Sequence, residues 1–214
     1  GGASGSPDGA IDWITSVIAA ESFAAPSPRI NRGSALSVPF ESGSLDAVIT
    51  DPPYYDNVPY ANIADFFYVW LKRCLGDLYP SDFASIGTPK KQEAVADAKR
   101  HGDDRTRAET TYEEMMEKAF REASRVLKPA GLLTVVYAHK TTVGWATLVE
   151  SLRRSDFMVD EAWPLDTERP GRVRAISSAA LASSIFLVAR KREGATTGSF
   201  DEEVHPELER IVRE

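Results

Sequence analysis

The chain has 214 residues, of which 43% are hydrophobic and 27% charged, an ordinary globular composition that excludes a wholly disordered or collagen-like protein. With 25 Lys and Arg against 32 Asp and Glu, the formal net charge is −7, so a contact with nucleic acid needs a local basic patch or a partner. No apolar run reaches the roughly 18 residues that span a membrane, and the single cysteine and three histidines show neither a disulfide pair nor a zinc spacing, so we expect a cytoplasmic protein without a metal.

The first half of the chain predicts two helices, one strand and one irregular segment. Residues 1–9 are Gly, Ser, Ala, Pro and Asp, which predicts a flexible lead-in or linker. Apolar residues recur at helical spacing over 11–18, and a β-branched run over 45–50 predicts a buried strand that stops at two prolines. The run 63–75 predicts an apolar helix with an aromatic stripe in the core, and 79–111 loses all periodicity, which predicts a mobile insertion.

Helical and strand patterns alternate in the second half. In chain order they are a helix over 112–127, a strand over 132–137, a helix over 144–154, a strand over 157–163 and a strand over 183–189. Such alternation predicts an α/β fold with a Rossmann-like, largely parallel sheet in a region covering 10–193. The remaining residues, 194–214, are polar and predict a tail.

Asp51-Pro52-Pro53-Tyr54 directly follows the predicted strand, and open α/β sheets place their ligands at the carboxyl ends of strands. The Asp51 carboxylate can accept one N–H of an exocyclic amine, the Pro52 carbonyl can accept the other, and Tyr54 offers a ring for stacking. Two acceptors would draw the nitrogen lone pair out of conjugation and towards an electrophilic methyl group. The same tetrapeptide can also simply end a strand, because Asp and Pro are common in turns.

The residues around this turn resemble a known family. Gly33-Ser34-Ala35, the run 44–54 and the run 126–133 resemble class I SAM-dependent methyltransferases, and specifically the amino-methyltransferases of DNA. More closely, the tyrosine-rich runs 51–60 and 65–72 are similar to large prokaryotic adenine-specific DNA methylases that carry an N-terminal domain of uncharacterised function. Further similar runs are 138–142, 167–172 and 178–184, and the resemblance covers about residues 30 to 191.

The resemblance implies transfer of a methyl group from S-adenosyl-L-methionine (SAM) to the N6 amine of an adenine flipped out of duplex DNA. Flipping is needed because a paired, stacked base cannot reach the methyl donor. The implied amine-binding residues are Asp51, Pro52 and Tyr54, with Pro53 shaping the turn. Tyr55, Asn57 and Tyr60 are implied to line the base pocket or its mouth, whereas Ser34, Ala35 and Asp51 are implied cofactor contacts. Lys140 follows a strand at the same sheet edge and can contact a phosphate or remain a solvated loop lysine.

One part of the family pattern is missing. The chain has no Gly-x-Gly that follows a strand, nor the acidic residue that holds the SAM ribose. We therefore expect the later half of a methyltransferase domain, with the glycine loop supplied by a longer protein or a partner subunit. Two alternatives remain open: a non-catalytic nucleic-acid-binding or assembly subunit, and a cytosine N4 or RNA adenine target. The biological setting also stays open between restriction-modification, phage defence and housekeeping methylation.

Overall fold

The computed structural model describes residues 6–22, 28–165, 184–192, 194 and 210, and the chain divides into two compact units, Gly1–Gly33 and Ser34–Glu214. The first unit holds helix α1 (Pro7–Glu21), which confirms the predicted helix and includes the end of the expected lead-in. The Ser6 hydroxyl caps this helix by accepting the N–H of Gly9 at 3.1 Å, and Pro7 suits the first turn because its missing N–H would have no helical partner.

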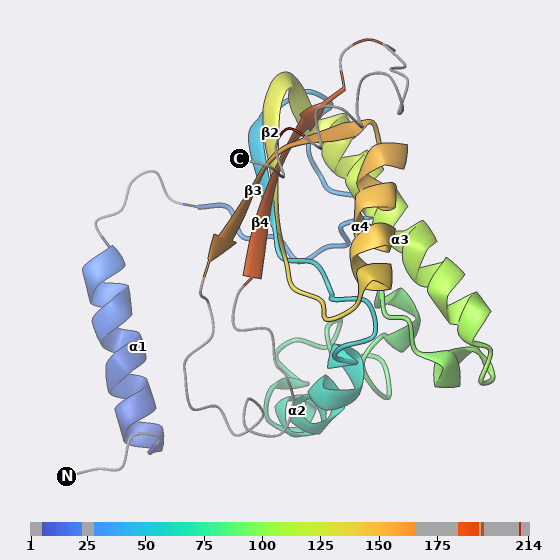
Figure 1. Cartoon of the computed structure of the whole chain (residues 1–214). Coiled ribbons are helices and arrows are strands. Elements are labelled where there is room, and N and C mark those ends of the chain that lie inside the picture. The colour runs from blue at the N-terminus through green and yellow to red at the C-terminus, as the bar shows by residue number, and fades with distance from the viewer. Residues whose placement is uncertain (1–5, 23–27, 166–183, 193, 195–209, 211–214) are drawn as a thin grey trace. The chain divides into compact units, whose positions relative to one another are not determined.

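The second unit is an open four-stranded sheet with helices, as the predicted α/β class requires (Figure 1). Its strands are β1 (Leu45–Thr50), β2 (Leu127–Tyr137), β3 (Phe157–Leu165) and β4 (Ser184–Lys191). Its helices are α2 (Tyr60–Leu75), α3 (Arg105–Val126) and α4 (Thr142–Arg154), with two short 3-10 helices, η1 (Lys90–Gln92) and η2 (Ala98–His101).

The strand order is β1-β2-β4-β3, and only β1 and β2 are parallel neighbours. Strand β4 lies between β2 and β3 and runs antiparallel to both, so the expectation of a largely parallel sheet is wrong for the described strands. Alternating helices and strands predict parallel crossovers, but antiparallel neighbours need no helix between them. The connection from β3 to β4, residues 166–183, lies outside the described residues, together with the run 167–172 named above.

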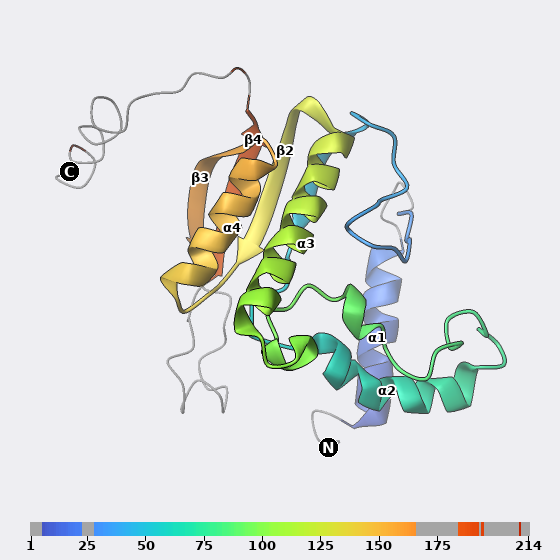
Figure 2. The same ribbon diagram turned by 90° about the vertical axis from the view of Figure 1, so that its right-hand side faces the viewer.

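The hydrophobic core lies between one face of the sheet and two helices that cover it, α3 and α4 (Figure 2). Helix α3 contributes Tyr112, Met116 and Phe120, which are spaced four residues apart and therefore share one face of the helix. The remaining buried core residues come from α4, from the strands and from the loop after β1: Tyr55, Leu127, Leu133, Val135, Tyr137, Leu148, Leu152, Phe157, Leu187 and Ala189.

Two apolar surfaces of the second unit are exposed instead of buried. On the sheet face opposite the helices, the side chains of Ile49 and Trp163 are 76% and 56% exposed. The aromatic stripe of α2, expected in the core, is exposed as well: Phe67 is 59% and Trp70 56% exposed. Helical periodicity identifies which side of α2 is apolar, but it does not supply an element to cover that side. Cys74, on the same helix, is a free and exposed thiol.

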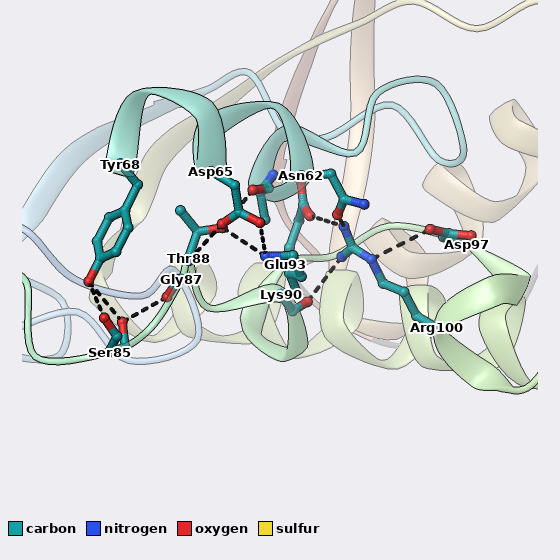
Figure 3. Close-up of polar contacts among 11 residues, drawn as sticks. Asn62, Asp65, Tyr68, Ser85, Gly87, Thr88, Lys90, Glu93, Asp97 and Arg100 are labelled. Atoms are coloured by element: carbon teal, nitrogen blue, oxygen red, sulfur yellow. Dashed lines mark hydrogen bonds and ion pairs between the residues drawn. The ribbon is translucent and has the colours of Figure 1, made fainter. Parts of the chain in front are cut away.

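Residues 79–111 are expected from the sequence to be a mobile insertion. Part of this segment contacts the other side of α2 through polar side chains (Figure 3). The Asp65 carboxylate accepts hydrogen bonds from the Thr88 N–H at 2.9 Å and the Thr88 hydroxyl at 2.7 Å, and it also pairs with the Lys90 ammonium. These bonds, the Lys90 bond first, hold the pKa of Asp65 well below its usual value. Arg100 pairs with Glu93 at 2.7 Å, and from Arg105 onward the segment is already helix α3.

Candidate functional site

The Asp-Pro-Pro-Tyr turn lies where β1 ends, as the sequence predicts. Asp51, Pro52, Pro53 and Tyr54 line a pocket of about 410 Å³ together with Tyr60, the first residue of α2. Pockets of this size hold small organic ligands. The turn and the start of the next helix therefore form one candidate binding site at the carboxyl end of a strand that has a parallel neighbour.

Tyr54 is positioned by the strand next to β1. Its ring packs edge-to-face on the ring of Tyr137, the last residue of β2, with centroids 5.2 Å apart. Burial, and next a hydrogen bond that the hydroxyl donates to the Asp51 carboxylate, raise the pKa of Tyr54 above its ordinary value. The two oxygens of the Asp51 carboxylate retain further lone pairs for a ligand beside this bond.

Tyr55 points the opposite way, into the core. It has a positive φ of 51°, and its side chain is 3% exposed. Its ring packs edge-to-face on Tyr112 at 5.2 Å and on His139 at 5.6 Å. Burial raises the pKa of the Tyr55 hydroxyl, as does its hydrogen bond to Glu109. Tyr55 therefore packs behind the turn, on its core side, and is not among the residues that line the pocket.

Of the other predicted substrate contacts, only Tyr60 lines the pocket. Asn57 closes the turn through its backbone, because its N–H donates to the Tyr54 carbonyl at 2.9 Å. Lys140 lies exposed after β2 and is not among the lining residues. Its neighbour His139 does reach the turn: the ring Nε2 lies 3.4 Å from the Asp56 carboxylate. The sequence pattern predicts no role for His139. The feature that could have identified it is its position just after β2, which runs parallel to β1.

The two predicted cofactor contacts outside the turn do not line this pocket. Ser34 and Ala35 belong to a tight turn in which Ser34 pairs with Ser37. The chain that follows is tied to the end of α3, where the Glu122 carboxylate accepts the Val38 N–H at 2.8 Å. This end of α3 leads directly into β2, so the segment from Val38 lies at the start of the strands, away from Asp51.

Within the described ranges, no group of three or more His, Cys, Asp or Glu side chains could hold a metal ion. No helix in the same part of the chain is both long and apolar enough to cross a membrane. Fold and pocket together define an α/β protein with an open sheet and a ligand-sized pocket at the end of a strand.

No protein-family model and no curated protein matches the chain. Among solved structures, it is similar to a protein of Thermus thermophilus assigned as a DNA modification methylase, with 17% identity and a TM-score of 0.41 over 80% of this chain and 56% of that one. A structure of the Thermus protein complexed with S-adenosyl-L-methionine gives 16% identity and a TM-score of 0.41 over 80% and 59%. The [4+2]-cyclase SpnF gives 17% identity and a TM-score of 0.41 over 85% and 62%. The chain thus spans 56% to 62% of the length of these structures.

Proposed function

We propose that this chain carries the amine-binding part of a SAM-dependent DNA methyltransferase that acts on the N6 amine of adenine. The observation that carries the proposal is the Asp51-Pro52-Pro53-Tyr54 turn, which lines a pocket at the carboxyl end of β1. Open α/β sheets bind their ligands at such ends.

The proposed roles follow from the donors and acceptors of the turn. Asp51 and the Pro52 carbonyl accept the two N–H groups of the target amine, and Tyr54 stacks on the base, which partly offsets the cost of unpairing it. When bound, SAM supplies an electrophilic methyl group for direct displacement by the amine nitrogen. The protein contributes orientation of the amine and polarisation of its lone pair, without a covalent enzyme intermediate.

The residues of this chain fit the amine better than they fit the whole cofactor. Ser34 and Ala35 do not line the pocket, and the sequence contains no glycine loop after a strand. We therefore propose that a longer protein or a partner subunit supplies the remaining SAM contacts. The exposed apolar face around Ile49 and Trp163 supports this proposal, because a parallel pair such as β1 and β2 is normally covered on both faces.

Calorimetry with SAM, followed by transfer of a labelled methyl group to duplex DNA, tests the proposal. We expect Asp51→Ala to lower the transfer rate by about 100-fold or more, because it removes a preorganised acceptor at the reacting nitrogen. The matched control is Asp46→Ala, the same change near the other end of β1, where the carboxylate pairs with Lys128 at the surface. Recovery of N6-methyladenine would support adenine in DNA as the target. N4-methylcytosine would indicate cytosine instead, and a preference for RNA would indicate an RNA substrate.

A second function is favoured by the missing glycine loop: a non-catalytic nucleic-acid-binding or assembly subunit that retains the base pocket. A folded chain that binds DNA but neither binds SAM nor transfers methyl groups would support this alternative. Methyl transfer that depends on Asp51 would exclude it.

A further inference from the structure

The hydroxyl group of Tyr112 lies directly beneath the Asp-Pro-Pro-Tyr turn, although the two are far apart in sequence. It donates a hydrogen bond to the Pro53 carbonyl at 2.8 Å and accepts one from the Tyr55 N–H at 3.2 Å. A phenol has one donor and two acceptor sites, so these two bonds use its only donor and one of its acceptor sites.

The two backbone groups that Tyr112 holds belong to the residues on either side of Tyr54. The second of these residues, Tyr55, has a φ of 51°, a backbone conformation that is unfavourable for a bulky residue. Such a conformation persists only where the surroundings determine it. Here the Tyr55 N–H is held by Tyr112 and the Tyr55 carbonyl accepts the Ala96 N–H at 3.0 Å.

We infer that Tyr112 is a positioning residue of the pocket: its hydroxyl fixes the turn so that the Pro52 carbonyl and the Tyr54 ring keep their directions toward the ligand. This inference rests on the proposed function for the identity of that ligand, but not for the geometry of the turn. Tyr112 does not line the pocket and touches the turn only from the core side, where it is fully buried.

A purely structural role would use the Tyr112 ring, and a positioning role uses the hydroxyl. Tyr112→Phe separates the two, because phenylalanine keeps the ring in the core and removes only the oxygen. A matched control is Tyr68→Phe, which removes a hydroxyl that also donates to a backbone carbonyl, that of Ser85 at 2.8 Å, on the loop side of α2 (Figure 3).

The experiment measures amide hydrogen exchange at Tyr55 by NMR in the full chain, together with kcat and KM for methyl transfer. In the wild type the Tyr55 amide is expected to be protected. In Tyr112→Phe we expect its exchange to be at least about tenfold faster, and kcat to fall by about 10- to 100-fold with KM for SAM nearly unchanged, because a misplaced ligand costs rate more than cofactor affinity. Tyr68→Phe should change neither quantity.

An unprotected Tyr55 amide in the wild type would overturn the inference, whether or not the variant folds. So would a folded Tyr112→Phe with wild-type exchange at Tyr55, or one whose exchange rises while kcat stays the same. If the wild-type chain alone transfers no methyl group, catalysis belongs to the longer protein or the complex that supplies the remaining SAM contacts, and the exchange measurement alone decides whether Tyr112 holds the turn.

Discussion

Tyr54 and Tyr55 are neighbours in sequence, but the structure gives them opposite environments. Tyr54 faces the pocket with its hydroxyl on Asp51, and Tyr55 is buried among Tyr112 and His139. The chain also bends at this point, where Tyr55 has a positive φ. Within this one turn, Tyr54 therefore faces the pocket, whereas Tyr55 packs into the core that supports the turn.

A substitution at Gly144 tests how tightly the core residues behind this turn are packed. A Cβ added there would lie 2.2 Å from Nδ1 of His139, and the imidazole could only yield by leaving its place between Tyr55 and Tyr137. We expect Gly144→Ala to lower the free energy of unfolding by about 1–3 kcal/mol, as overpacking does. Chemical denaturation measures the change.

The control for this substitution is Gly33→Ala, where an added Cβ meets nothing within 4 Å and the backbone has no positive φ. It should stay within about 0.5 kcal/mol of the wild type. A Gly144→Ala variant as stable as the wild type would show that the His139 ring relocates without cost.

Contiguity in the sequence explains which site residues can be predicted. Asp51 to Tyr54 stand out because the proposed amine-binding groups lie on four adjacent residues and a strand pattern precedes them. Tyr112, Tyr137 and His139 do not, since each joins the turn only through tertiary packing of α3 and β2 against β1. Tyr55 is predicted as a pocket residue because its positive φ leaves no signature in a run of tyrosines.

At the level of elements, α2 has two different sides. One side is joined to the following segment through Asp65 and Lys90, and the other presents an uncovered row of large side chains: Ile63, Phe66, Phe67, Trp70 and Leu71. The sequence predicts the positions of the helices and strands well, because apolar periodicity sets them. It does not predict the exposure of this row or the insertion of β4 between β2 and β3, because periodicity does not encode which elements become neighbours.

The exposed side of α2 leads to a stability prediction. Phe67→Ser removes an aromatic ring that is already 59% exposed, so we expect the free energy of unfolding to change by less than about 0.5 kcal/mol. The buried counterpart, Phe120→Ala on α3, should cost about 3–5 kcal/mol. Urea denaturation compares the two variants, and a loss of several kcal/mol in Phe67→Ser would show that this side of α2 is covered in solution.

For the whole molecule, the net charge limits the DNA binding that the proposed function requires. The net charge is −7, and cationic groups such as Lys90, Arg100 and Arg125 are already paired with carboxylates. We expect this chain alone to bind duplex DNA with a Kd of about 10⁻⁴ M or weaker at physiological salt, and to gain little when salt is lowered, because it neutralises few phosphates. Fluorescence anisotropy with a labelled duplex measures both quantities. Micromolar binding with a steep salt dependence would contradict this expectation.

The outer edge of β1 offers a place where a further strand can join the sheet beside the Asp-Pro-Pro-Tyr turn. Within the described strands β1 pairs only with β2, so its other edge presents free N–H and C=O groups beside the exposed side chain of Ile49. A strand from another polypeptide can extend the sheet there through main-chain hydrogen bonds. The proposed source of the remaining SAM contacts, a longer protein or a partner subunit, can therefore join this sheet through a single strand pair.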